Sequence, residues 1–171
     1  MEFFELAKQR RSIRVFARQA VEEEKLQQIL RAANVAPSAG NLQAYEIYVV
    51  RGRDQRTALA SAAYGQDFIR DAPVALVFCT HPARSEPKYR ERGRRLYALQ
   101  DATIACTFAM LAVADLGLAT VWVGAFSDEA VWKAIGSPEG VQPVAMLPIG
   151  HAGETPAATS RRRLSSLVHE V

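Results

Sequence analysis

The residues best suited to chemistry in this sequence are arginines that gather in short clusters near both ends. Arg10, Arg11 and Arg14 fall within five residues together with Ser12, and a second run covers residues 161–163. Guanidinium groups offer forked donors that match a phosphate, and a hydroxyl adds one more donor. The first cluster taken alone fits a solvated basic turn equally well, and the run over 161–163 taken alone is more typical of a solvated tail.

Two further segments have the composition of a binding loop. Residues 37–43 (PSAGNLQ) combine small residues, which permit close backbone approach, with amide and hydroxyl groups suited to a heterocycle edge. Residues 122–126 (WVGAF) end an apolar strand, where Gly124 could present a bare backbone N–H to a flat ring. A plain helix-to-strand turn and a simple strand exit explain the same two segments.

Several other kinds of site find no support in the sequence. The serines lack a GxSxG setting, and His81, His151 and His169 are scattered without metal-ligand spacing. No GxGxxG motif is present and no Walker-type lysine follows the small-residue loop, so both the dinucleotide and the nucleoside triphosphate fingerprints are missing. Hydrolase, metalloenzyme and P-loop classes are therefore disfavoured.

Composition indicates one ordinary globular domain. The chain has 171 residues, 49% apolar and 23% charged, with a formal charge of +3. A mild basic excess suits anionic small molecules at least as well as nucleic acid. Cys79 and Cys106 lie in apolar runs and are expected to be buried free thiols. Without a signal-like N-terminus or an apolar run of about 18 residues, the expected location is cytoplasmic, with no membrane span.

The elements that must position these residues follow from hydrophobic periodicity. The pattern predicts helices over 2–10, 21–34, 53–64, 96–116 and 127–136, and strands over 45–50, 74–79, 119–123 and 141–149. The prolines of the last strand favour an edge or end position. Residues 81–95 are the candidate for a mobile insertion or lid. This order predicts an α+β or mixed α/β domain with a single sheet layer covered by helices.

Taken together and in order, these elements resemble the nitroreductase family of FMN-dependent enzymes along essentially the whole chain. The motifs that carry the resemblance include RRSIRVF, APSAGNLQAYEIYVV, FIRDAPVALVF, ATVWVGAF and LPIGHAGE. The resemblance implies a three-layer fold with a mainly antiparallel sheet, in a single domain over residues 1–171. It also implies an intertwined homodimer in which residues 152–171 embrace the partner subunit.

The resemblance further implies which residues bind FMN. The phosphate contacts would be Arg10, Ser12, Arg161 and Arg163, with Arg11 next to them, and Arg14 would lie beside the N1/O2 side of the isoalloxazine. Pro37, Ser38, Ala39 and Asn41 would pack on the flavin from the other subunit. Gly124 and Ala125 would lie next to flavin N5 and O4, and Gln66 near the ribityl chain or pyrimidine. No catalytic side chain and no metal is implied, because the cofactor carries the chemistry.

The implied activity is a ping-pong oxidoreductase that moves hydride from NADH or NADPH through flavin N5 to a small nitroaromatic or quinone-like acceptor. The usual aromatic lid is reduced to residues 81–95, which leaves the substrate open. A dehalogenase-like or flavin-consuming biosynthetic enzyme is the alternative within the family, but such members normally carry a dedicated lid, for which this chain has little room. Outside enzyme chemistry, the alternatives are a non-catalytic flavin carrier and a nucleic-acid-binding module. The arginines show little of the aromatic interleaving that nucleic-acid binding favours.

Overall fold

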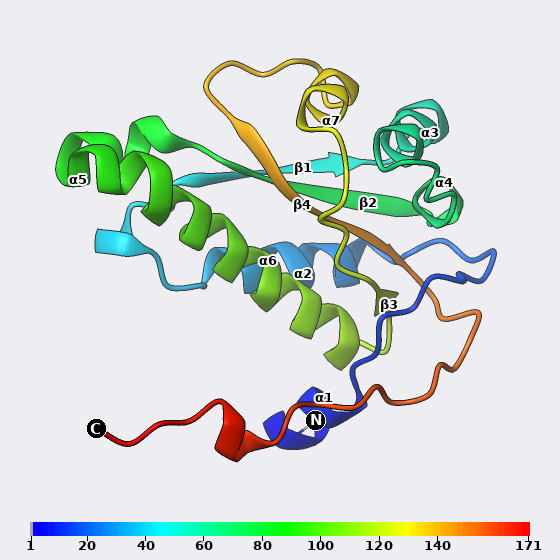
Figure 1. Ribbon diagram of the computed structural model, residues 1–171. Coiled ribbons are helices and arrows are strands. Elements are labelled where there is room, and N and C mark those ends of the chain that lie inside the picture. The colour runs from blue at the N-terminus through cyan, green and yellow to red at the C-terminus, as the bar shows by residue number, and fades with distance from the viewer. Residues whose placement is uncertain (1) are drawn as a thin grey trace.

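A four-stranded antiparallel sheet forms the centre of the molecule (Figure 1). The structure is a computed structural model that describes residues 2–171. The strand order is β1-β2-β4-β3. The strands are β1 (Tyr45–Val50), β2 (Val74–Thr80), β3 (Ala119–Thr120) and β4 (Gln142–Gly150).

Helices cover both faces of this sheet and make three layers (Figure 1). On one face lie α2 (Glu23–Asn34) and α6 (Ala98–Asp115), and on the other lie α3 (Arg53–Ala62), α4 (Phe68–Asp71) and α7 (Asp128–Ala134). The remaining helical elements are α1 (Phe3–Gln9), η1 (Ala39–Asn41), η2 (Pro82–Arg84), α5 (Glu86–Arg92), η3 (Gly93–Tyr97) and η4 (Leu164–Ser166). The predicted α+β class is confirmed, and the homodimer stays a prediction.

The two faces of β2 supply two separate cores, because side chains alternate along a strand. Leu76 and Phe78 pack under α2 and α6, while Val77 and Cys79 pack under α3 and α7. All seven residues of the strand are buried, because helices cover both faces of the sheet. Both cysteines are free and buried, and burial raises the pKa of the Cys79 thiol to about 12. The expectation of buried free thiols is confirmed for both cysteines.

The third and fourth strands differ from expectation, and one proline explains the difference. The sequence predicts a strand over 119–123, whereas β3 has two residues, and β4 is an inner strand rather than an edge. After Thr120 pairs with Ile149, regular pairing returns only where Val123 exchanges both backbone hydrogen bonds with Met146. The same register sets residue 121 opposite Pro148, which has no N–H to donate. The ladder is therefore interrupted on that side of β4.

Residues 81–95 are largely helical, and they lead into α6 to form a helix over Glu86–Asp115. By length and composition this helix could cross a bilayer, which corrects the expectation that no segment is long and apolar enough. Gln100, Asp101 and two threonines interrupt the apolar run within it, although the average hydropathy is high. The helix packs against α2 and the sheet, as a core helix does. Whether residues 81–95 move stays a prediction.

Candidate functional site

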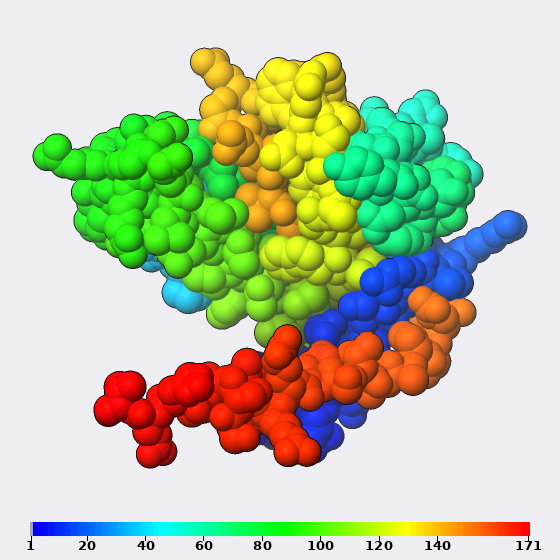
Figure 2. All heavy atoms as spheres, viewed as in Figure 1, coloured from blue at the N-terminus to red at the C-terminus, as the bar shows by residue number. Residues whose placement is uncertain are grey.

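Arginines from the two ends of the chain line one cavity of about 610 Å³. Its walls come from the end of α1 with the segment that follows, and from the tail at residues 156–161; Figure 2 shows the tail (orange to red) lying along the N-terminal segment (blue). The polar lining includes Arg10, Arg11, Ser12, Arg14 and Arg161, and none of the described lining residues is acidic. We call this the basic cavity. It brings five of the predicted site residues together.

The electrostatics of the basic cavity favour an anion. Burial, then Arg161, then Arg11 lower the pKa of Arg10, because desolvation and like charges both oppose its cation. The side chains of Arg10, Ser12 and Arg14 have no hydrogen-bond partner in the described part of the chain. By contrast, Arg11 donates to the backbone carbonyls of Lys8 and Arg10 at the end of α1. Forked donors left unpaired beside a hydroxyl fit a phosphate group.

Hydrogen bonds between the N-terminal segment and the start of the tail hold the basic cavity together. The amides of Arg14 and Val15 donate to one carboxylate oxygen of Glu154, at 2.6 and 3.0 Å. On the other side of this segment, the Ile13 amide donates to the Thr120 carbonyl at 3.1 Å. Sequence reasoning assigned Glu154 no role. The sequence signal that could have indicated this role is that Glu154 is the only acidic residue near the start of the tail, shortly after the end of β4.

The small-residue loop is fixed by a buried carboxylate on α6. Asp101, 1% exposed, accepts hydrogen bonds from the amides of Ala39 at 2.9 Å and Ala44 at 3.2 Å. Within the loop, the Ser38 hydroxyl accepts from the Gln43 amide at 3.0 Å. Gly40, Asn41 and Gln43 all have positive φ. Glycine adopts a positive φ without strain, whereas for Asn41 and Gln43 this conformation is costly and persists because neighbouring groups hold it. Sequence reasoning assigned Asp101 no role, because it is a lone acid near the start of a largely apolar helix.

The loop and the basic cavity are far apart within one chain. The loop lies beside α5, near the N-terminal end of α6, whereas α1 packs near the C-terminal end of α6 (Figure 1). Within a single chain, the loop residues that are predicted to contact the flavin therefore lie away from the basic cavity. These residues are Pro37, Ser38, Ala39 and Asn41.

The remaining predicted residues lie outside the basic cavity. Gly124 and Ala125 follow the bridge at Val123 and are exposed, so their backbone is accessible. Gln66 donates to the Ala125 carbonyl at 3.2 Å and so supports this exposed segment. Arg163 precedes η4 in the exposed tail and does not line the cavity.

A comparison with protein families identifies the group to which this site belongs. A sequence model of the nitroreductase family matches residues 7–66 and 55–151. The chain belongs to the nitroreductase family. This nitroreductase-family chain is 30% identical over 189 aligned positions to an NADH dehydrogenase of Thermus thermophilus, with 95% of this chain and 92% of that protein covered. It is also 30% identical to an NAD(P)H-dependent FMN reductase of Bacillus subtilis, with 94% and 70% covered.

Solved structures agree with this assignment. The NADPH:FMN oxidoreductase of Vibrio harveyi, solved in complex with NAD+, superposes with a TM-score of 0.89 at 28% identity, covering 98% of this chain and 76% of that one. A nitroreductase family protein of Clostridium difficile superposes with a TM-score of 0.87 at 31% identity, covering 99% and 98%. The resemblance predicted from the sequence is confirmed, as is the nitroreductase-type fold.

Proposed function

We propose that this nitroreductase-family chain is an FMN-dependent oxidoreductase that passes electrons from NADH or NADPH to a small acceptor. The basic cavity is the observation that carries the proposal. It gathers cations from sequence positions about 150 residues apart, and it leaves the side-chain donors of Arg10 and Arg14 unpaired within the described residues. The names of the relatives from Bacillus subtilis and Vibrio harveyi, an FMN reductase and an NADPH:FMN oxidoreductase, support the same cofactor and donor.

Arg10, Ser12 and Arg161 would hold the phosphate, and Arg11 would add positive potential beside it. Arg14, at the same cavity, would lie at the N1/O2 edge of the ring, where a fixed cation stabilises negative charge. Arg163 would reach the phosphate from the tail. FMN, when bound, supplies the two-electron chemistry, so the chain's own task is to bind it, orient it and leave one face open.

A second copy of the chain would complete the site. Because the small-residue loop lies far from the basic cavity of its own chain, Pro37, Ser38, Ala39 and Asn41 could reach a cofactor there only from a partner. The exposed backbone of Gly124 and Ala125, supported by Gln66, would lie along the ring edge. In this arrangement each cofactor has contacts from two chains, and the tail lies on the partner.

We further propose a ping-pong cycle with a nitroaromatic or quinone-like acceptor. Donor and acceptor would occupy the same open face in turn, because a flat ring held along one edge leaves one broad surface for both. The basic cavity offers no carboxylate or histidine among its described lining residues, so no side chain there would serve as a proton relay.

The test is an anaerobic titration of the purified protein with NADH and, separately, NADPH. We expect the protein to carry flavin absorbance that bleaches with one equivalent of donor and returns when nitrobenzene or a benzoquinone is added. Initial rates should give parallel lines in double-reciprocal plots. A protein that binds no FMN would contradict the proposal, and a flavin that no donor bleaches would contradict the enzymatic part of it.

A further inference from the structure

Residues 84–97 form a strongly basic segment, which we call the basic arm. It contains six Lys or Arg residues and two Glu residues, so its net charge is +4, whereas the whole chain carries +3. The arm comprises the end of η2, then α5 and η3. The rest of the chain is therefore close to neutral. This concentration of charge in one short segment points to an anionic partner.

The basic arm is attached to the small-residue loop rather than free in solvent. Arg84 donates to the carbonyls of Gln43 at 3.0 Å and Tyr45 at 2.7 Å, and it forms an ion pair with Glu46. These contacts tie the start of the arm to the end of the loop. Within the arm, the rings of Tyr89 and Tyr97 meet edge to face at 5.0 Å. The arm therefore has a defined position relative to the loop.

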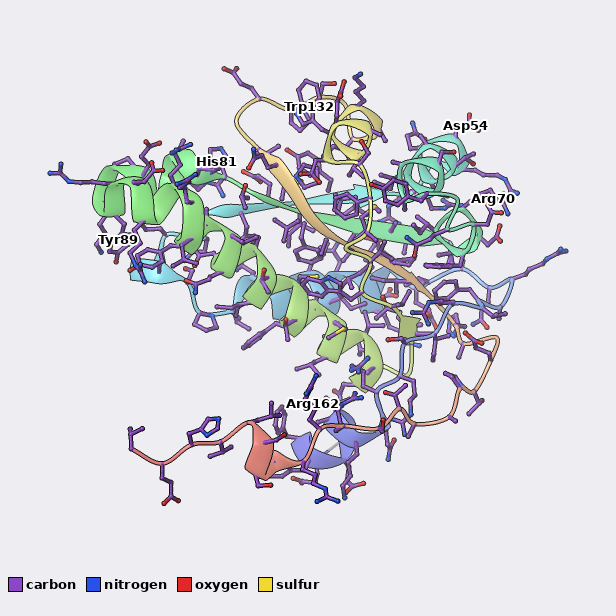
Figure 3. The ribbon with its side chains drawn as sticks, in the orientation of Figure 1. Asp54, Arg70, His81, Tyr89, Trp132 and Arg162 are labelled. Carbon is purple, nitrogen blue, oxygen red and sulfur yellow. The ribbon has the colours of Figure 1, made fainter. Side chains whose placement is uncertain are left out.

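Two side chains of the arm lie directly against the loop at Gly40. A Cβ added to Gly40 would lie 2.5 Å from the Tyr89 hydroxyl and 2.7 Å from the Lys88 Nζ. Figure 3 shows Tyr89 on the side of α5 that faces the loop. The glycine thus leaves room for a phenol and an ammonium group beside the part of the loop that carries Ala39 and Asn41.

Lys88 is one of three cations of the arm, with Arg90 and Arg92, for which the described part of the chain provides no counter-charge. Arg84, Arg94 and Arg95 each pair with a glutamate. In the described part of the chain, Lys88 has no acidic partner, and its Nζ lies 5.3 Å from the centre of the Tyr89 ring. The side chain is exposed. An uncompensated ammonium at this position attracts an anion without first having to break an ion pair.

We propose that Lys88 is a specificity-determining residue that selects small-molecule substrates bearing a carboxylate or phosphate. The inference rests on the proposed function, in which the small-residue loop borders the flavin of the partner subunit. Lys88 would then stand at the rim of the open face, where donor and acceptor must enter. The anion could belong to the acceptor or to the 2′-phosphate of NADPH, since both offer the same charged oxygens. The Tyr89 hydroxyl would add one donor beside the ammonium.

The test compares 4-nitrobenzoate with neutral 4-nitrobenzamide, and NADPH with NADH, in the wild type and in Lys88→Met. In a ping-pong cycle kcat/KM for the acceptor and kcat/KM for the donor are measured independently. We expect Lys88→Met to lower kcat/KM for the charged member of one pair about 3- to 10-fold and to leave the neutral member, or NADH, unchanged. Calorimetric binding of 4-nitrobenzoate to the oxidised protein, without donor, reports acceptor affinity apart from turnover.

Two control variants sharpen the result. Lys88→Arg should keep the preference for the charged substrate, and Lys133→Met, which removes an exposed lysine from α7, should change neither ratio. A selective loss for 4-nitrobenzoate assigns the site to the acceptor, and a selective loss for NADPH assigns it to the donor. Equal effects on charged and neutral substrates, or no effect, would overturn the inference while the flavin and the basal turnover stand. Absent flavin in the wild type would instead overturn the proposed function.

Discussion

The surroundings of Arg10 disfavour its positive charge. It is half-buried beside Arg161 and Arg11, and these effects together lower its pKa. A bound phosphate would reverse the sign of the local potential, so that the same arginines would stabilise one another through the anion. The closeness of these positive charges therefore causes both their mutual repulsion and their capacity to bind an anion.

Arg10→Ala should weaken FMN binding by about 1.5–3 kcal/mol, the scale of a hydrogen bond to a charged group. Equilibrium dialysis of the variant against FMN measures this loss. Arg18→Ala, which removes an exposed arginine outside the basic cavity, is the matched control and should bind FMN like the wild type. Unchanged flavin content in Arg10→Ala would rule out the phosphate assignment.

Asp101 acts on the other side of the proposed site, through the loop that it holds. Asp101→Ala would leave the amides of Ala39 and Ala44 without their acceptor, so we expect the free energy of unfolding to fall by about 2–5 kcal/mol. Asp101→Asn keeps one acceptor oxygen and should lose about half as much. Urea denaturation measures both variants, with Glu24→Ala on the exposed face of α2 as control. Equal stability of Asp101→Ala and the wild type would show that the loop does not depend on this clamp.

Residue types that cluster were predictable from the sequence, and lone residues were not. Arg10, Arg11, Ser12 and Arg14 stand together, so the sequence alone is enough to indicate their shared chemistry. Asp101 is a single acid in an apolar helix, and its value depends on two amides about sixty residues away. Only the three-dimensional contact reveals such a residue, because no local pattern encodes it.

At the scale of elements, the N-terminal segment and the tail form one unit. Neither belongs to the main sheet, yet the amides of Arg14 and Val15 meet Glu154, and Phe16 bridges to Ala152. The arginines of the two ends converge because this pairing fixes the direction of both segments. The positions of these arginines in the basic cavity therefore depend on both segments together.

Two substitutions of Glu154 separate the effect of its hydrogen bonds from the effect of its charge. Glu154→Ala removes the acceptor for two amides and should loosen both ends, lowering stability by about 1–2 kcal/mol and weakening FMN binding with it. Glu154→Gln keeps an acceptor oxygen and removes a negative charge near the arginines, so it should bind FMN at least as tightly as the wild type. Urea denaturation and FMN titration give the two quantities. FMN binding that weakens equally in both variants would mean that charge, not backbone pairing, is what Glu154 contributes.

The sequence predicts best those elements whose structure depends on their own residues rather than on the strands or helices beside them. The strand over 45–50 is found as predicted, and Gly117 follows the end of α6 with φ +71, as expected of a helix-ending glycine. The strand over 119–123 was predicted too long because its pairing depends on Pro148, a residue of another strand. Pairing partners, unlike propensities, cannot be read from one segment.

The surface of a single chain leaves apolar side chains exposed on α6 and in the tail. Phe108 on α6 is 37% exposed, and Leu164 and Leu167 in the tail are 73% and 59% exposed. The tail is too polar and too short to cover its own leucines. A second copy would cover this surface and would bring its small-residue loop to the basic cavity. Dimerisation and flavin binding should therefore be lost together.

Phe108→Glu puts a charge into this surface and should favour the monomer, which sedimentation velocity detects. If two chains share each cofactor, FMN release should follow the same protein-concentration dependence as dissociation, because binding to the dimer alone links the two equilibria. Tyr64→Glu is the matched control, since it places the same charge at an exposed aromatic after α3, in the opposite layer. A Phe108→Glu monomer that keeps its flavin would place the whole cofactor site within one chain. The separation of the loop from the basic cavity would then need another explanation.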